Sequence, residues 1–250
     1  MILPRQVEQC VEQIAPVELK MDYDNVGLLV DCGAPVRRIL VALDATEAVI
    51  QEAAETNCEM IVCHHPIIFH PLHRLEMTNP LMDAAKSGIS ICCAHTNFDA
   101  AKGGVNDVLC ELFQLEKVEP AGGMGRLGCL AEGPMELSDF AEKVKETLDV
   151  SSVQVVDAER PVSRLLVVGG AGGDFLPLAQ ELGCDTLLTG EAKHHEGLEA
   201  IHRSINLVVA GHYETERPAM RALQQALQEL LKDEATCVLS QQEHAPFQYL

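Results

Sequence analysis

Arg38-Ile39-Leu40-Val41-Ala42 is a short apolar run rich in β-branched residues, and Arg164-Leu165-Leu166-Val167 repeats its pattern later in the chain. Each run is followed by a segment of helical character about 10 to 15 residues long and then by another apolar run. This alternation is typical of buried parallel strands joined by crossover helices. The sequence therefore predicts an α/β fold.

The same alternation of apolar runs and helical segments continues along the whole chain. Strands are expected at Arg38–Ala42, Met60–Cys63, Ile89–Ala94, Leu165–Gly169, Thr186–Leu188 and Leu207–Ala210. Helices are expected near residues 4–14, 46–56, 79–87, 104–113, 138–148, 174–182, 192–203 and 215–231. A more β-like stretch punctuated by glycine and proline separates two halves. We therefore predict a first α/β lobe at 1–121, a short β-rich connecting region at 122–160 and a second α/β lobe at 161–250, the two lobes forming a composite pair.

The two halves resemble one another. An offset of 126 residues places the run at Arg38 on the run at Arg164, and an offset of 117 places His95 on His212 and Asp99 on Glu216. An internal duplication explains these matches, although chance similarity between two β-α-β units explains some of them as well. In open α/β sheets the chemistry lies beyond the carboxyl ends of the strands, where these residues fall.

Composition excludes several classes of function. The chain has 250 residues and a formal net charge of -20, without a compensating cluster of Lys or Arg, so nucleic-acid binding is not expected. No signal peptide is visible and no apolar run approaches the length of a membrane span. The ten cysteines lie mostly in apolar runs and form no C-x-x-C pair, which is typical of a reducing compartment. We therefore expect a cytoplasmic protein without a membrane partner.

Five residues stand out as candidate metal ligands. The pair His64-His65 follows the strand expected at Met60–Cys63, and it is accompanied by Asp99, His212 and Glu216. Three imidazoles and two carboxylates suit zinc, iron, cobalt or manganese better than calcium or magnesium. The sequence predicts two divalent ions sharing a water molecule, which would make a hydrolytic site. An ordinary network of polar loop residues is the alternative.

Two further residues are candidates for catalytic or positioning roles. His95 precedes Asp99 by four residues and is expected to orient a ligand or bound water, or else to bond a backbone carbonyl. Glu191 occupies the place of His65 in the second half and is expected to face the same centre. His194 and His195 have no equivalent in the first half and are expected at the rim or on the surface.

Five motifs in order carry a family resemblance. They are Asp24-Asn25-Val26-Gly27-Leu28, His64-His65-Pro66-Ile67-Ile68-Phe69, His95 through Asp107, Thr189 through His195, and Gly211-His212-Tyr213-Glu214-Thr215-Glu216. Together they resemble the NGG-interacting-factor-three-like (Nif3-like) family, whose members are known as dinuclear-metal proteins or GTP cyclohydrolase I type 2 homologues. The resemblance implies two duplicated α/β lobes with a metal cleft between them, and assembly as a toroidal homohexamer. One departure is Tyr23, where the family usually has Trp.

The resemblance carries the same ligand set, His64, His65, Asp99, His212 and Glu216, over to this chain. Its implied activity is hydrolysis of a nucleotide or related phosphorylated small molecule, with His95 or Glu191 as a catalytic acid. A metal-binding or metal-delivery protein without catalysis, and a regulatory assembly protein, remain as alternatives.

Overall fold

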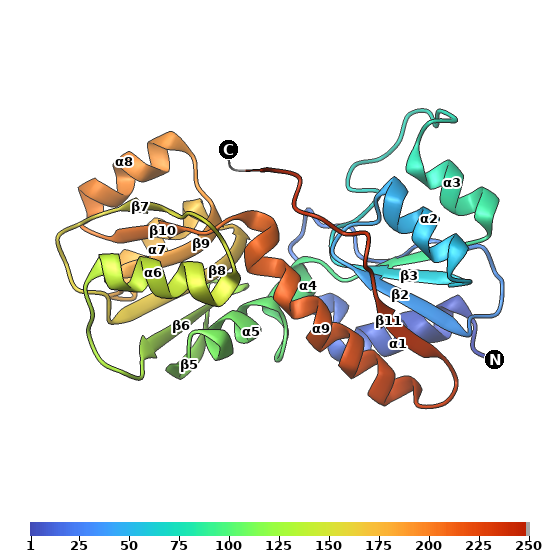
Figure 1. Ribbon diagram of the computed structural model, residues 1–250, viewed down its shortest axis with the longest axis horizontal. Coiled ribbons are helices and arrows are strands. Elements are labelled where there is room, and N and C mark those ends of the chain that lie inside the picture. Colours follow the sequence, from blue (N-terminus) through green and yellow to red (C-terminus); the bar gives the residue numbers. More distant parts are fainter. Residues whose placement is uncertain (249–250) are drawn as a thin grey trace. The chain divides into compact units, whose positions relative to one another are not determined.

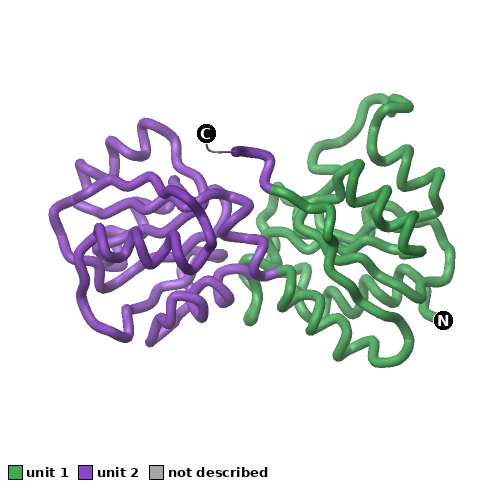
Figure 2. Tube along the Cα trace, in the orientation of Figure 1, with its two compact units in different colours: residues 1–104, 220–244 green, residues 105–219, 245–250 purple. Residues whose placement is uncertain are grey.

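The computed structural model describes residues 1–248, which divide into two compact units (Figure 2). Unit 1 comprises Met1–Gly104 and Met220–His244, and unit 2 comprises Val105–Ala219 together with the residues from Ala245 onward. These bounds differ from the predicted lobes at 1–121, 122–160 and 161–250. Helix α9 (His212–Leu231) begins in unit 2 and ends in unit 1, so the end of the chain returns to the first unit.

Unit 1 is built on a five-stranded sheet in the order β1-β4-β3-β2-β11 (Figure 1). The strands are β1 (Gly27–Val30), β2 (Arg38–Ala42), β3 (Met60–Cys63), β4 (Ser90–Cys93) and β11 (Thr236–Leu239). β11, β2, β3 and β4 run parallel to their neighbours, and only β1 is antiparallel to β4. The α/β prediction and the strands expected at Arg38–Ala42 and Met60–Cys63 are confirmed.

The helices of unit 1 cover both faces of this sheet. Its helices are α1 (Pro4–Ile14), α2 (Glu47–Glu55), α3 (Pro80–Ser87), the short α4 (Thr96–Ala100), the 3-10 turn η1 (Val17–Leu19) and residues 220–231 of α9. Leu40 and Ile61 belong to the apolar cluster that also contains Val49 of α2 and Ala84 of α3. α1 and the last turns of α9 lie on the opposite face (Figure 1). Because the central strands are covered on both sides, their sequences are continuously apolar.

Unit 2 contains a six-stranded sheet in the order β5-β6-β8-β9-β10-β7. The strands are β5 (Leu115–Ala121), β6 (Gly125–Leu130), β7 (Gln154–Val156), β8 (Arg164–Ala171), β9 (Thr186–Glu191) and β10 (Asn206–Val209). The helices are α5 (Val105–Leu112), α6 (Leu137–Leu148), the 3-10 turn η2 (Gly173–Phe175), α7 (Leu176–Glu181) and α8 (His194–Arg203). β8, β9 and β10 are parallel, and the outer strands pair antiparallel to them.

Both faces of this second sheet are also packed. α5 and α6 share an apolar cluster with Leu165 and Val167 of β8, whereas α7 and α8 share one with Leu166 and Val168. The alternation along β8 follows from the period of two in a strand. The region predicted as a connecting segment, 122–160, holds β6, α6 and β7, so it is an integral part of unit 2.

The two sheets share a parallel core with matching register. Ile39 pairs with Met60 in unit 1 and Leu165 pairs with Thr186 in unit 2, which preserves the offset of 126. Met60 pairs with Ser90, and Thr186 pairs with Asn206, which gives the next strand an offset of 116 and not the 117 used in the sequence comparison. This similarity is what an internal duplication predicts.

The change of offset alters which residues correspond in the helices that follow. The amide of Asp99 donates to the carbonyl of His95 at 3.0 Å, and the amide of Thr215 donates to the carbonyl of Gly211 at 3.1 Å. Backbone equivalence therefore pairs Asp99 with Thr215, and Glu216 lies one residue further along its helix. The positions of the Asp99 and Glu216 carboxylates are therefore not equivalent, and each is described below within its own unit.

No helix among residues 1–248 is both long enough and apolar enough to cross a bilayer.

Candidate metal centre

In each unit the predicted ligands follow the carboxyl ends of parallel strands. His64 and His65 come directly after β3, and His95 follows β4 and precedes α4. In unit 2, Glu191 ends β9 and His212 opens α9 after β10. Short strand-to-helix connections at this edge are the usual place for ligand-binding residues in an α/β sheet.

Three imidazoles lie together in unit 1. One ring nitrogen from each of His64, His65 and His95 lies within 4.8 Å of the others, which is a grouping able to hold a metal ion. The ring centroids of His64 and His65 are 5.0 Å apart, those of His64 and His95 are 5.2 Å apart, and those of His65 and His95 are 5.6 Å apart. His64 is fully buried, whereas His65 and His95 are half-buried. The structure thus adds His95 to the predicted doublet.

Each of these rings is held from behind through its Nδ1 atom. The contacts are His64 Nδ1 to the Ala94 carbonyl oxygen at 2.8 Å, His65 Nδ1 to Asp44 Oδ1 at 2.9 Å and His95 Nδ1 to Asp24 Oδ1 at 2.8 Å. A carbonyl or carboxylate acceptor favours the tautomer with its proton on Nδ1, so the lone pair of each ring lies on Nε2. Metal-binding histidines show this arrangement, in which the outer hydrogen bond fixes both the tautomer and the ring orientation.

Asp99 adds a buried carboxylate to the imidazoles. It lies in α4 and is 7% exposed, with its Oδ1 atom 3.5 Å from Nε2 of His64. An oxygen ligand beside imidazole nitrogen is compatible with zinc, iron, cobalt or manganese. The predicted neighbours His64, His65 and Asp99 are therefore brought together within unit 1.

Asp24 is held by several hydrogen bonds. Burial by itself raises the pKa of Asp24, but hydrogen bonds from His95 and Thr96 outweigh it and lower that pKa to about 2. The Thr96 amide donates to Asp24 Oδ2 at 3.0 Å, and the Thr96 hydroxyl donates to the same atom. The carboxylate therefore remains ionised and holds the His95 ring in place.

Two buried thiols support the backbone of the histidine pair. Cys93 Sγ donates to the carbonyl of His64 at 2.9 Å, and Cys63 Sγ donates to the carbonyl of His65 at 3.2 Å. Burial raises the pKa of the Cys93 thiol well above its ordinary value, so it stays protonated and able to donate. These cysteines have a structural role beyond that of small buried hydrophobes.

Unit 2 carries its own group of ligand atoms. His212 Nε2 lies 3.1 Å from Glu216 Oε2, and His212 Nδ1 lies 3.1 Å from Glu191 Oε1. The Glu216 side chain is 4% exposed, whereas the Glu191 side chain is 53% exposed. Glu191 thus occupies the same position toward His212 that Asp44 and Asp24 occupy toward His65 and His95. In this structure it orients a histidine.

Gly170 makes room for the Glu216 carboxylate. It has a φ of +62°, and a Cβ atom there would lie 2.2 Å from Glu216 Oε1 and 3.2 Å from His212 Nε2. Its amide donates to the Thr215 hydroxyl at 3.0 Å. A residue with a side chain would therefore displace the carboxylate as well as strain the backbone.

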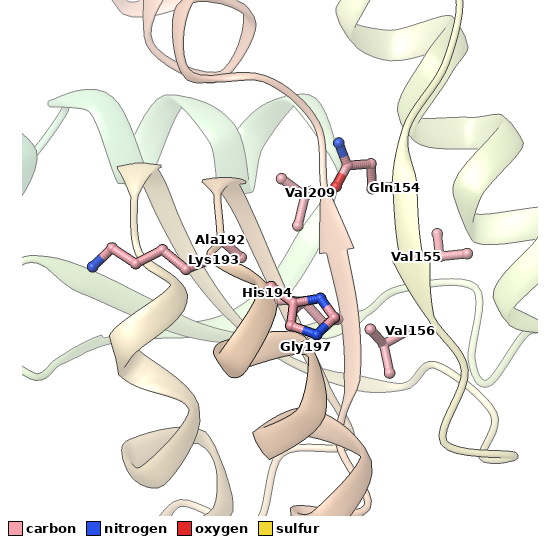
Figure 3. Close-up of a pocket in the computed structure, with 9 residues that line it drawn as sticks. Gln154, Val155, Val156, Ala192, Lys193, His194, Gly197 and Val209 are labelled. Atoms are coloured by element: carbon pink, nitrogen blue, oxygen red, sulfur yellow. The ribbon is translucent and has the colours of Figure 1, made fainter.

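A separate pocket in unit 2 contains one of the residues expected at the rim. This pocket of about 300 Å³ is formed by β7, β10 and the start of α8, and His194 lines it beside Lys193 (Figure 3). His194 and His195 are both exposed. Neither belongs to the groups of ligand atoms described above.

Sequence reasoning missed the roles of Asp24 and Asp44. Asp24 lies in one of the recognised motifs without a role assigned to it, and Asp44 comes two residues after β2. The position of Asp44 just past a buried strand is the same signal that identified His64 and His65. A search for carboxylates at every strand end would have found it.

The comparisons with known proteins agree with this fold and these motifs. The family model Duf34/NIF3 (NGG1p interacting factor 3) matches residues 3–246. A Clostridium perfringens protein named GTP cyclohydrolase 1 type 2 homolog is 31% identical over 254 residues, covering 96% of this chain and 97% of that protein. NGG1-interacting factor 3 of Saccharomyces cerevisiae is 34% identical over 248 residues, covering 85% of this chain and 84% of that protein.

A solved structure shows the same fold. The Bacillus cereus protein related to NIF3 superposes with a TM-score of 0.92 at 24% identity, covering 99% of each chain. The match of the family model and the two sequence relatives together show that this chain belongs to the Duf34/NIF3 (NGG1p interacting factor 3) family.

Proposed function

We propose that this protein is a metal-dependent hydrolase acting on a nucleotide or a related phosphorylated small molecule. The observation that carries the proposal is the set of imidazoles whose Nδ1 atoms are all tied to carbonyl or carboxylate oxygens, since this arrangement prepares their Nε2 atoms for a cation. Relatives of this chain carry the name GTP cyclohydrolase 1 type 2 homolog, which is consistent with a nucleotide substrate.

The proposed ligands of the metal ions are His64, His65, Asp99, His212 and Glu216. We propose that these residues hold two divalent ions drawn from zinc, iron, manganese and cobalt, because mixed imidazole and carboxylate donors suit these metals. When bound, such ions supply Lewis-acid charge and make water more acidic. The chain itself carries a net charge of -20, so an anionic substrate would need these cations to be attracted to the site.

The protein's own side chains would orient these ligands and manage protons. Asp44 and Asp24 fix two rings in unit 1, and Glu191 fixes His212 in unit 2. Glu191 is also exposed enough to reach a bound substrate, so it remains our candidate for proton transfer to or from that substrate. The family resemblance also makes His95 a candidate for this proton transfer.

Turnover of a substrate panel tests the proposal. The protein is stripped of metal, reconstituted separately with manganese, iron, zinc and cobalt, and assayed with GTP, other nucleotides and simple phosphoesters. We expect metal-dependent hydrolysis of at least one compound, reduced by about 100-fold or more in His64→Ala, because loss of a ligand removes the ion's charge from the reacting centre. His73→Ala is the matched control, since His73 is exposed and lies in the same unit.

The opposite result also has a definite meaning. If the reconstituted protein turned over none of these compounds, the hydrolase proposal would fail. A bound metal that exchanged readily with a chelator would then favour metal binding or delivery without catalysis.

The proposal includes assembly as a homohexamer, as the family resemblance implies. Light scattering coupled to size exclusion should give a mass about six times that of the 27.2-kDa chain. A monomeric or dimeric mass over the working concentration range would refute this part of the proposal.

A further inference from the structure

We infer that Tyr23 and Phe69 form a stacking site in unit 1 for a planar heteroaromatic ring, such as the base of a nucleotide. The inference rests on the proposed function and deepens it, because it selects substrates with an aromatic base from among phosphorylated small molecules. It gives a role to two residues that lie outside the candidate ligands. Tyr23 was noted in the sequence only as a departure from the family, and Phe69 only as part of a motif.

Three rings of unit 1 lie one after another beside the candidate ligands. The ring centroids of Tyr23 and Phe69 are 6.4 Å apart with an angle of 60° between the planes, and those of Phe69 and His95 are 6.1 Å apart with an angle of 85°. Tyr23 is 62% exposed and Phe69 is 38% exposed, whereas His95 is half-buried. An aromatic surface therefore begins in solvent and reaches the group of imidazoles.

Core packing does not explain the Tyr23 and Phe69 pair. Phe113 and Phe140 of unit 2 also form an aromatic pair, with centroids 6.0 Å apart, and both are fully buried. Tyr23 and Phe69 have a similar separation but keep much of their surface in water. Aromatic rings stabilise a fold mainly through the area that they bury, so an exposed pair contributes little to the core and presents apolar surface to a ligand.

The turn that carries Tyr23 is fixed on both sides of that residue. The Met21 amide donates to the Thr96 hydroxyl at 2.9 Å, and the Thr96 amide donates to Asp24 Oδ2 at 3.0 Å. Lys20 Nζ donates to the carbonyl of Asp24 at 3.1 Å. Because the backbone around Tyr23 is already held, a ligand that stacks on this ring does not have to order the turn.

Asn25 fastens the segment that carries Phe69 to the same turn. Its side-chain amide donates to the carbonyl of Ile68 at 2.6 Å, and its backbone amide donates to Asp24 Oδ1 at 2.8 Å. The same Asp24 oxygen holds the His95 ring. The segment 66–79 contains no helix or strand, so this contact, and not secondary structure, holds the start of the segment beside Tyr23.

A purine or pyrimidine ring suits this surface. Every base has a π face, so stacking on aromatic side chains is available to all of them. Because the Phe69 ring also lies beside His95, a bound base would lie next to the proposed cation site, which suits an anionic phosphate. A simple phosphoester has no group for the aromatic pair. The pair therefore separates two kinds of substrate that the proposed function leaves open.

The test uses a fluorescent reporter in the full-length protein. The chain has no tryptophan, so Tyr23→Trp introduces a single one and keeps an aromatic ring at this position. The variant is stripped of metal and titrated with adenosine, with inosine and with ribose 5-phosphate, which lacks a base. We expect both nucleosides to quench the tryptophan emission to a saturating level, and ribose 5-phosphate to leave it unchanged.

Further substitutions in this variant separate stacking from general apolar contact. Phe69→Ala and Phe69→Leu should each weaken nucleoside binding by about 5- to 100-fold, because both remove the second ring although leucine remains apolar. Met77→Ala is the matched control and should change nothing, since Met77 is exposed and apolar in the same segment.

Two controls address the reporter itself. Leu72→Trp in the otherwise unchanged chain places a tryptophan at another exposed position of the same segment, where nucleosides should quench only by collision and without saturation. With the native Tyr23, saturation-transfer NMR should show contact between the protein and the base protons of adenosine. Tyr23→Ala should abolish that transfer.

Three results would overturn the inference. The first is the absence of saturable quenching by nucleosides, and the second is equal nucleoside affinity with Phe69 and with Phe69→Leu. The third is a Tyr23→Ala variant that changes the mass of the assembly but still binds nucleosides, because the pair would then be a contact between copies of the chain.

Failure of this inference and failure of the proposed function are distinguishable. Metal-dependent turnover of a simple phosphoester without nucleoside binding would leave the proposed function standing and remove the stacking site. Nucleoside binding as expected, combined with no turnover of any compound, would remove the hydrolase and leave the stacking site intact.

Discussion

Gly170 shows how closely single residues control this centre. Its backbone lies in the left-handed region, at a φ of +62°, and it lies against the Glu216 carboxylate. Asp24 and Asp44 also act on single neighbours. Asp24 orients the ring of His95 and Asp44 orients the ring of His65, each through one hydrogen bond to that ring. The candidate ligand atoms are therefore placed by residues outside the proposed ligand set.

Gly170→Ala should weaken metal binding by about 10-fold or more, because the new Cβ would lie 2.2 Å from Glu216 Oε1 and force that carboxylate aside. The matched control is Gly183→Ala, since Gly183 has a φ of +68° with nothing within 4 Å of the added Cβ. Both variants should lose similar stability from backbone strain, roughly 1 kcal/mol or more. Metal titration of both would show whether only Gly170→Ala affects affinity, and equal affinities would remove the role assigned to Gly170.

Asp24 should make the apo protein sensitive to acid. Its pKa is lowered from 3.8 to about 2 in the folded state, so its contribution to stability is fully present above pH 3.8 and is lost as the pH falls through 2. The size of that contribution is about 2 kcal/mol. Chemical denaturation in the presence of chelator, from pH 5 to pH 2, should show the wild type losing about this much more stability than Asp24→Asn. Parallel curves for the two proteins would contradict the assigned environment of Asp24.

The two parallel strands β3 and β4 position the candidate ligands of unit 1. They end side by side, with Cys63 paired to Cys93, and the histidines begin immediately beyond them. The thiols of those two cysteines then donate to the carbonyls of His65 and His64. The end of the sheet therefore holds the ligand-bearing turn from behind as well as delivering it.

Cys93→Val should lower metal affinity by about 10-fold, because it removes the thiol that donates to the His64 carbonyl. Cys93→Ser, which retains a donor, should have a smaller effect on affinity. Cys92→Val is the control, since Cys92 is equally buried in the same strand and points to the other face of the sheet. If Cys92→Val and Cys93→Val altered affinity equally, general packing and not the hydrogen bond would be responsible.

The elements that were predictable from the sequence are those with continuous apolar character. β2 and β3 are confirmed at the expected residues, because both of their faces are buried. β5 was missed because it carries exposed charged residues such as Glu116 and Lys117 at the edge of its sheet. β1 and β11 are edge strands of four residues each, and such short strands leave little periodicity to detect. α9 begins at His212, three residues before the predicted start, and Pro218 lies inside the helix.

For the molecule as a whole, the sequence predicted two α/β units but not which segments of the chain belong to each unit. β11 pairs with β2 although Thr236 lies 198 residues after its partner Arg38, and no local pattern in the sequence indicates such a pairing. Gln224 and Gln228 of α9 bond the backbone of Cys237 in β11, which ties the end of the chain to unit 1. The proposed ligands could be named from the sequence because their residue types and their positions at strand ends are visible there. The supporting acids Asp24 and Asp44 were not, because an acid gains its role only from a neighbour brought close by folding.

We propose that two divalent metal ions bind to each chain through His64, His65, Asp99, His212 and Glu216. The most direct measurement is the metal content of the purified protein after saturation with manganese or cobalt and removal of excess metal, for the wild type beside His64→Ala and Glu216→Ala. We expect about two ions per wild-type chain and clearly fewer in each variant. A wild type that retains no metal, or variants that retain as much as the wild type, would contradict it.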